Sequence, residues 1–246
     1  MRTVRIQDLL VVTLAVLATG CARQFPGPTR PQIEANQAEL MSVLDDGTVS
    51  YNLERLEISM RPMTDSELNR LLPQESNSGA ESTNPYTYGD WQPLGESYTP
   101  QRFTVFLLRT KNYEFPKIRV NPERVVLRTQ NRRTYEALDI LRLGEYFRAH
   151  AQAWAGNAFR RYRASQEALR RTVYRGDMIF SGQEDEGYII FEALPPDVTH
   201  FSVTLEDVAL RFNTADEPVE TTRVTYQFER EIFSGYQPPA EETVAQ

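Results

Sequence analysis

Residues 201–212 read FSVTLEDVALRF, and this stretch decides the fold class that we expect. Apolar side chains occupy alternate positions over residues 201–205 and again over residues 208–212, which is the period of a β-strand with one buried face. The second set falls on the opposite parity, so an unbroken strand would turn it toward solvent. The change of phase at Glu206-Asp207 therefore predicts a β-bulge or a tight bend there.

Further strands are predicted on both sides of this stretch. Val224, Tyr226 and Phe228 alternate with polar residues, which indicates another strand with one buried face. Residues 103–108 and 188–194 are apolar on both parities, so we expect them to be central strands covered on both faces. Turn signals separate three other strand-like segments, which are residues 51–60, 117–120 and 124–129. Several short strands with this spacing favour an antiparallel β-sandwich.

Two helices are predicted among these strands. The segment TDSE at 64–67 has the spacing of a capping box, which indicates a short helix over about residues 65–72. Apolar residues recur every three or four positions over about residues 143–174, which predicts a long amphipathic helix inserted into the sandwich. Gly156 lies inside this stretch. Since glycine costs about 1 kcal/mol relative to alanine in a helix, we expect a bend or a break there.

The order of four segments supports the same fold class. They read FTVFLLRTKN, IRVNPERVVL, EGYIIFEAL and FSVTLEDVALRF, with the helical insertion after the second. This pattern resembles the immunoglobulin-like (telokin-like) domains of secreted, mostly uncharacterised bacterial lipoproteins, over about residues 103–228. The resemblance implies a mainly-β, immunoglobulin-like antiparallel β-sandwich, and it supplies no catalytic residues. We expect a single such domain over residues 35–233.

The N-terminus has the layout of a secretory signal peptide. Arg2 and Arg5 precede an apolar run over residues 9–18, and small residues follow it. A membrane-spanning helix needs about 17–25 apolar residues, so this run is too short to cross a bilayer. We therefore expect residues 1–20 to direct export and then to be removed.

The cysteine that follows the small residues resembles the lipobox of bacterial lipoproteins. The resemblance covers residues 1–21 and implies cleavage before Cys21, a diacylglyceryl thioether on its thiol and acyl chains such as palmitate. The usual leucine three positions before the cysteine is Ala18 here. Ala22 is not aspartate, which by the family's sorting rule implies the outer membrane, on its periplasmic face or at the surface. The alternative is an ordinary signal peptide with Cys21 left as a free thiol.

Three segments of the mature chain are expected to be irregular. Residues 21–34 carry prolines and a glycine, which predicts a lipidated tether to the membrane. Residues 234–246 are expected to form a flexible tail. A flexible loop is expected over residues 73–100, and loops of this length are usually functional or disordered. Its aromatic residues are candidates for binding a protein partner or, alternatively, a small ligand or glycan, over residues 86–98: Tyr86, Tyr88, Trp91 and Tyr98.

Charge is segregated along the chain. The formal net charge is −7, yet residues 101–175 contain 17 basic and 6 acidic side chains. Candidate partner-binding residues on the long helix are Arg160, Arg161 and Arg163. These arginines could pair with the acidic remainder of the same chain, with anionic lipid headgroups or with an acidic protein partner, which we prefer of the two external options. Nucleic acid is not expected as a partner of an exported, acidic chain.

The sequence contains little that favours catalysis. One cysteine and two histidines exclude an internal disulfide framework and make a cysteine or histidine metal site improbable. Phosphate-binding glycine loops and a nucleophile elbow are absent. The acidic residues 184–186 fit an acidic turn better than a cation site. We therefore expect neither a cofactor nor a metal. The function predicted is that of a lipid-anchored cell-envelope protein that acts as a non-catalytic structural or protein-interaction module.

Overall fold

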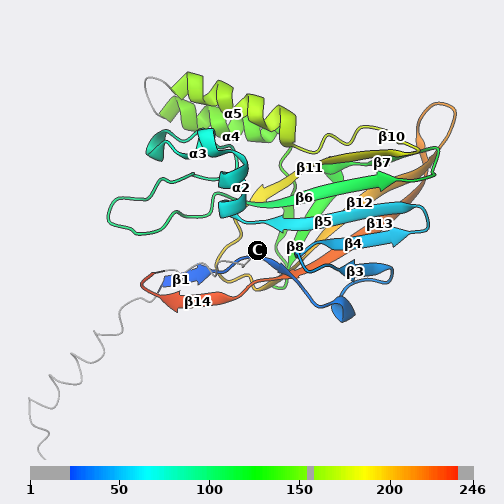
Figure 1. Cartoon of the computed structure of the whole chain (residues 1–246), viewed down its shortest axis with the longest axis horizontal. Coiled ribbons are helices and arrows are strands. Elements are labelled where there is room, and N and C mark those ends of the chain that lie inside the picture. Colours follow the sequence, from blue (N-terminus) through cyan, green and yellow to red (C-terminus); the bar gives the residue numbers. More distant parts are fainter. Residues whose placement is uncertain (1–22, 154–157, 238–246) are drawn as a thin grey trace, which may run out of the picture.

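The computed structural model describes residues 23–153 and 158–237, and the side chains of residues 150–153 and 158–161 lie outside the described part. Two antiparallel sheets pack against each other, and helices cover the outer face of one of them at one end (Figure 1). This arrangement confirms the prediction of a mainly-β antiparallel sandwich.

The first sheet has the strand order β11-β6-β5-β4-β3. Its strands are, in that order, Gln183–Glu192, Phe103–Asn112, Leu56–Met63, Val49–Leu53 and Met41–Val43. The second sheet has the order β10-β7-β12-β13-β2, with β8 beside β12 and β9 beyond β8. Its strands are β10 Ile179–Phe180, β7 Lys117–Val120, β12 His200–Phe212, β13 Pro218–Glu229, β2 Arg30–Pro31, β8 Val125–Thr129 and β9 Thr134–Glu136.

Aromatic side chains from both sheets fill the space between them. The ring of Phe106 in β6 lies 4.9 Å from that of Phe228 in β13, centroid to centroid, and 6.1 Å from that of Phe191 in β11. The hydroxyl of Tyr226, which is fully buried, donates a hydrogen bond of 2.8 Å to the carbonyl of Ile58 in the opposite sheet. A buried hydroxyl needs such a partner, because leaving it unpaired costs about 1–3 kcal/mol.

The strand β12 contains the predicted bulge. Its register with β13 shifts between Leu205 and Val208, and buried residues lie on both sides of the shift. The sheet also changes neighbour at this point, since β8 pairs with residues 201–205 of β12 and β7 pairs with residues 208–209. The bulge therefore lets one strand keep its apolar side inward while two successive strands share its edge.

The short helix α2 (Asp65–Leu71) forms as predicted. The Glu67 N–H donates to the hydroxyl of Thr64, and the Thr64 N–H donates to the carboxylate of Glu67, which completes the capping box. A further helical turn, α3 (Pro73–Ser76), follows directly at Pro73, although the sequence predicted the end of the helix at about residue 72. Three 3₁₀ turns are also described: η1 Glu34–Asn36, η2 Gly79–Glu81 and η3 Pro122–Arg124.

The expected long helix over residues 143–174 is instead a pair, α4 (Ile140–Ala153) and α5 (Ala158–Thr172), which lie side by side above β6 and β11 (Figure 1). Leu143 of α4 and Leu169 of α5 both belong to the apolar cluster beneath them. A continuous helix over that range would be about 48 Å long and would extend past the sheet. Folding back lets both halves bury their apolar stripe. Gly156 lies outside the described residues.

Both ends of the described chain are paired rather than free, which corrects the expected tether and part of the expected tail. The strand β1 (Arg23–Pro26) pairs antiparallel with β14 (Ile232–Gly235) over four residues. Phe25 is buried, and the Gly27 N–H donates to the carbonyl of Glu231 at 2.8 Å. The prediction failed because proline and glycine content describes local stiffness and carries no information about a partner strand more than 200 residues away.

Two strand predictions are corrected as well. Residues 51–60 contain the hairpin between β4 and β5, whose turn residues are Glu54 and Arg55 rather than glycine or asparagine. The strand β11 is the outermost of its sheet, although β6 is interior as expected. The edge of β11 is nevertheless covered, because its carbonyls accept hydrogen bonds from the N–H groups of Leu138 and Tyr174, which flank the helix pair.

Candidate functional site

The sequence places candidate binding residues in three regions, and the structure describes only some of them. Cys21 lies outside the described residues, as do the side chains of Arg160 and Arg161. Arg163 is described and is exposed on α5. The lipidation and the arginine surface therefore stay predictions.

Tyr86 is not an exposed binding residue. Its side chain is 0% exposed, its hydroxyl hydrogen-bonds to that of Thr172 at the end of α5, and its ring meets the ring of Tyr188 edge-on at 5.0 Å. Burial raises the pKa of the Tyr86 hydroxyl, against the opposing effect of its hydrogen bond with Thr172. Tyr86 joins the loop to the helix pair and to β11, so it acts as a structural anchor.

A buried asparagine organises the loop around Tyr86. The Asn84 amide nitrogen donates to the Ser76 hydroxyl at 2.9 Å and to the Asn69 carbonyl oxygen at 3.2 Å. The side-chain oxygen of Asn84 accepts a hydrogen bond of 2.8 Å from the backbone N–H of Tyr86, which forms an Asx turn. The loop over residues 76–90 is thus packed and hydrogen-bonded, which corrects the expectation that all of residues 73–100 is flexible. The Asn-Pro pair at 84–85 was the available sequence signal.

The face of Tyr88 is occupied by a cation of the same chain. The guanidinium carbon of Arg102 lies 4.9 Å from the Tyr88 ring centroid, 5.3 Å from that of Tyr146 and 4.5 Å from that of Phe147. Arg102 also donates to the carbonyls of Asn84 and Thr87 at 3.3 Å each. Arg102 thus fastens the loop to α4, and it occupies one face of the Tyr88 ring, on which a sugar or a ligand cation could otherwise stack.

The second half of the loop lies against β1. Phe25 and Tyr98 meet edge-on at 5.2 Å, and Arg23 forms an ion pair with Glu96. Trp91 and Tyr98 are half-buried, and the Trp91 ring lies 5.4 Å from that of Tyr88. These residues therefore share the end of the molecule at which the described chain begins.

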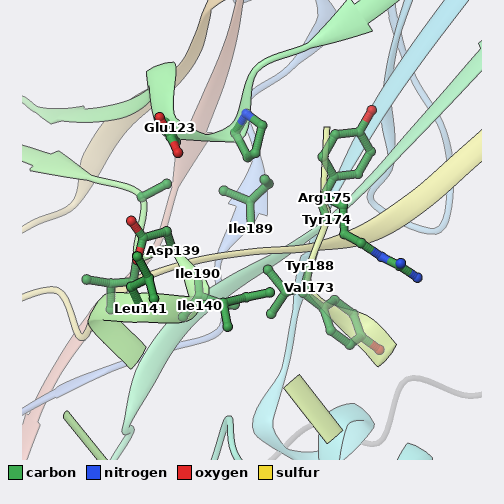
Figure 2. Close-up of a pocket in the computed structure, with 13 residues that line it drawn as sticks. Glu123, Asp139, Ile140, Leu141, Val173, Tyr174, Arg175, Tyr188, Ile189 and Ile190 are labelled. Carbon is green, nitrogen blue, oxygen red and sulfur yellow. The ribbon is translucent and has the colours of Figure 1, made fainter. Parts of the chain in front are cut away.

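A cavity of about 240 Å³ lies between the start of α4, residues 173–175 and β11. Figure 2 shows the residues that line it. Its walls are largely apolar. The Tyr174 ring turns toward the sandwich core and the Tyr188 ring toward the helices (Figure 2). Glu123 and Asp139 also line it, but an Asp139 oxygen accepts the Arg142 N–H at 2.7 Å and so caps α4. The cavity contains none of the aromatic loop residues, so it does not favour the glycan-binding alternative.

A second cavity, of about 470 Å³, lies beside Arg102. Its lining mixes both signs of charge, with Arg142, Glu145 and Glu192 beside Phe103 and Tyr146. Arg142 is already paired with Glu136 at 2.9 Å. This lining shows no set of convergent groups of one charge that would select a charged ligand.

Cross-strand ion pairs explain part of the charge segregation. Arg109 in β6 pairs with Glu186 in β11 at 2.6 Å, and Glu184 lies opposite Lys111 in the same register. The acidic residues 184–186 therefore lie within a strand, which corrects the expected turn. In the second sheet Arg128 of β8 pairs with Glu206 of β12 at 2.7 Å. Arg133, in the turn between β8 and β9, pairs at 2.7 Å with Asp197 in the turn before β12. These pairs involve arginines outside α5, so the pairing expected of the helix arginines stays a prediction.

Within the two described ranges, no three acidic, histidine or cysteine side chains converge as metal ligands would. The Arg128 side chain lowers the pKa of Glu206 by hydrogen bonding, so this carboxylate is held in its charged form. Across the same ranges, every helix falls short of the length and apolarity needed to cross a bilayer.

No protein-family model matches the chain, and no curated protein matches its sequence. Two solved structures are similar. The YjhA protein from Bacillus subtilis is 10% identical, with a TM-score of 0.36, and the match covers 72% of this chain and 93% of that one. MPT63, a secreted protein from Mycobacterium tuberculosis, is 11% identical, with a TM-score of 0.28, and the match covers 67% and 82%. At these scores we draw no conclusion from either.

Proposed function

We propose that this chain is a lipid-anchored protein of the bacterial cell envelope, held at the outer membrane by the lipid on Cys21. In this proposal its immunoglobulin-like sandwich is a non-catalytic structural or protein-interaction module. The observation that supports the proposal is the position of β1, which begins two residues after Cys21 and pairs along its length with β14.

That pairing makes the lipid a firm attachment point. Several acyl chains anchor effectively permanently, since each buried CH₂ contributes about 0.8 kcal/mol. Phe25 is buried against the domain and β1 is hydrogen-bonded to β14, so a load on the lipid passes directly into the folded body. A module that must stay fixed at a membrane while it holds a partner needs such a connection.

The proposed partner surface is the exposed side of α5. Arg163, Arg170 and Arg171 are exposed there, and Arg160 and Arg161 lie one turn nearer the start of the helix. Five arginines within residues 160–171 suit a partner with acidic side chains, because arginine pairs with carboxylates through two hydrogen bonds at once. We propose a protein of the envelope as that partner.

The lipid attachment is tested by growing cells that produce the full chain with alkyne-tagged palmitate. Wild type and the control Ala22→Ser should carry the tag and fractionate with membranes, whereas Cys21→Ser should lose both properties. A wild-type chain that is untagged, or a Cys21→Ser chain that is tagged equally, would refute the lipid anchor.

The partner is tested in the same cells with a photoreactive amino acid at position 163 and, as the control, at exposed position 215 in the β12–β13 turn. We expect a discrete protein adduct from position 163 that is absent from position 215. Equal adducts from both positions, or none from either, would count against an interaction module with this surface.

A further inference from the structure

The end of the domain at which β1 begins carries an inference that rests on the proposed lipid anchor. Only Ala22 separates Cys21 from Arg23, the first residue of β1. Two residues of extended chain span at most about 7 Å between Cα atoms. A lipid on Cys21 therefore holds this end of the sandwich against the bilayer, with no length of chain to lift it away.

The loop over residues 92–98 occupies the same end. The Arg23–Glu96 ion pair and the Phe25–Tyr98 ring contact hold it beside β1. Figure 1 shows β1, β14 and this loop extending to the same side of the molecule, at the left of the view. Side chains at the tip of this loop therefore lie at the same end of the domain as Cys21.

The tip is a tight turn that displays a leucine. The Glu96 N–H donates to the Pro93 carbonyl at 3.0 Å, and Gly95 has a φ of 81°, a value that favours glycine. Leu94, between them, is fully exposed. Below the turn, the hydroxyl of Thr99 donates to the Trp91 carbonyl at 2.8 Å. The turn is thus built from hydrogen bonds that do not involve the Leu94 side chain.

Two tyrosines lie at the same end of the domain. Tyr98 is half-buried against Phe25 of β1, and Tyr236, which directly follows β14, is 77% exposed. A single exposed leucine is ordinary on a protein surface. Here it lies with tyrosines at the end to which the membrane attachment is confined, and tyrosine and tryptophan are the residues that favour the level of the lipid headgroups.

We propose that this end of the domain rests on the lipid bilayer, with Leu94 inserted at the boundary of the acyl chains and Tyr98 and Tyr236 at headgroup level. Arg23 and Glu96 neutralise each other at the contact. The contact is therefore apolar in origin, and it depends little on lipid charge or salt.

The test uses the full lipidated chain carrying Leu94→Cys, with a polarity-sensitive dye attached to the thiol of the new cysteine. Lipidation consumes the thiol of Cys21, so the new cysteine alone reacts. The control is Ala215→Cys, which is exposed in the β12–β13 turn at the opposite end of the sandwich (Figure 1). The protein is placed in vesicles of phosphatidylethanolamine and phosphatidylglycerol, and separately in vesicles of phosphatidylcholine.

We expect the dye at position 94 to shift to the blue in both kinds of vesicle, and to be quenched several-fold more than the dye at position 215 by lipids with a quencher near the headgroup. A dye at position 94 that matches position 215 on vesicle-bound protein would overturn the proposal. A blue shift that needs added envelope proteins would also overturn it, in favour of a protein partner. Failure of the lipid anchor itself is distinguishable, because the unmodified Cys21 would then take a second dye.

Discussion

Truncating Tyr86 to alanine tests whether the loop over residues 76–90 is part of the folded core. The side chain of Tyr86 is fully buried among Leu68, Val105, Leu169 and Ile190, which come from α2, β6, α5 and β11. Removing an aromatic ring from such a site costs about 3–5 kcal/mol, because a cavity replaces its contacts. We therefore expect Tyr86→Ala to lower the free energy of unfolding by that amount.

Tyr86→Phe separates the ring from the hydroxyl. The Thr172 hydroxyl that bonds Tyr86 also donates to the Ala168 carbonyl at 2.8 Å, so it keeps a partner when the tyrosine hydroxyl is removed. A lost hydrogen bond is worth about 0.5–1.5 kcal/mol, and we expect the lower end of that range. Tyr236→Ala removes an exposed ring as the matched control, and we expect a change within about 0.5 kcal/mol.

The measurement is urea denaturation of the mature chain carrying Cys21→Ser, with unfolding monitored by circular dichroism. With a slope of about 2 kcal/mol per molar urea, Tyr86→Ala should shift the midpoint by about 1.5–2.5 M. If Tyr86→Ala shifted the midpoint no more than Tyr236→Ala does, the loop would not be anchored, and the flexible loop expected from the sequence would be restored.

Two further predictions concern a close backbone contact and a capping carboxylate. At Gly187 a Cβ would lie 2.5 Å from the Tyr174 nitrogen, so Gly187→Ala should destabilise by about 1–3 kcal/mol in urea denaturation. The control Gly144→Ala, with no contact under 3.6 Å, should be neutral or stabilising; equal effects would contradict the contact. Burial acts to raise the pKa of Glu67, but hydrogen bonds from Thr64 and Arg61 outweigh it and lower the pKa below its ordinary 4.5. The stability that this carboxylate contributes is present above pH 4.5 and is lost as the pH falls through the lowered pKa. Glu67→Gln should therefore flatten the acid side of a plot of unfolding free energy against pH. An unchanged slope on that side would disprove the role of Glu67.

The elements that the sequence predicted well are those with a strong local period. The bulge at 206–207 is visible because burying one face of a strand requires strict alternation, and an interruption of that alternation has few physical causes. The helix α2 is visible because both partners of its capping box, Thr64 and Glu67, lie within three residues of each other. In both cases the deciding interaction is local or is repeated along the element.

The features that were missed depend on distant contacts. The sequence predicted a tether over residues 21–34, whereas pairing with β14 orders β1 within it. The sequence did predict the apolar stripe over residues 143–174. The stripe is the same for one straight helix and for two helices that fold back on each other. The choice between them depends on the width of the sheet that the helices cover, which is not a local property of the sequence. The turn between β4 and β5 was missed because Glu54 adopts a positive φ of 49° without being glycine or asparagine.

The sequence by itself determined the fold class and where an anchor is expected, because strand period, helix period and the order of basic, apolar and small residues before Cys21 are properties of neighbouring residues. Only the tertiary structure decided which aromatic residues of the loop are available. Tyr86 and Tyr98 look alike in sequence, yet one lies beneath a helix pair and the other beside β1. Tyrosine carries both an apolar ring and a polar hydroxyl, so its exposure is decided by the long-range surfaces that meet it.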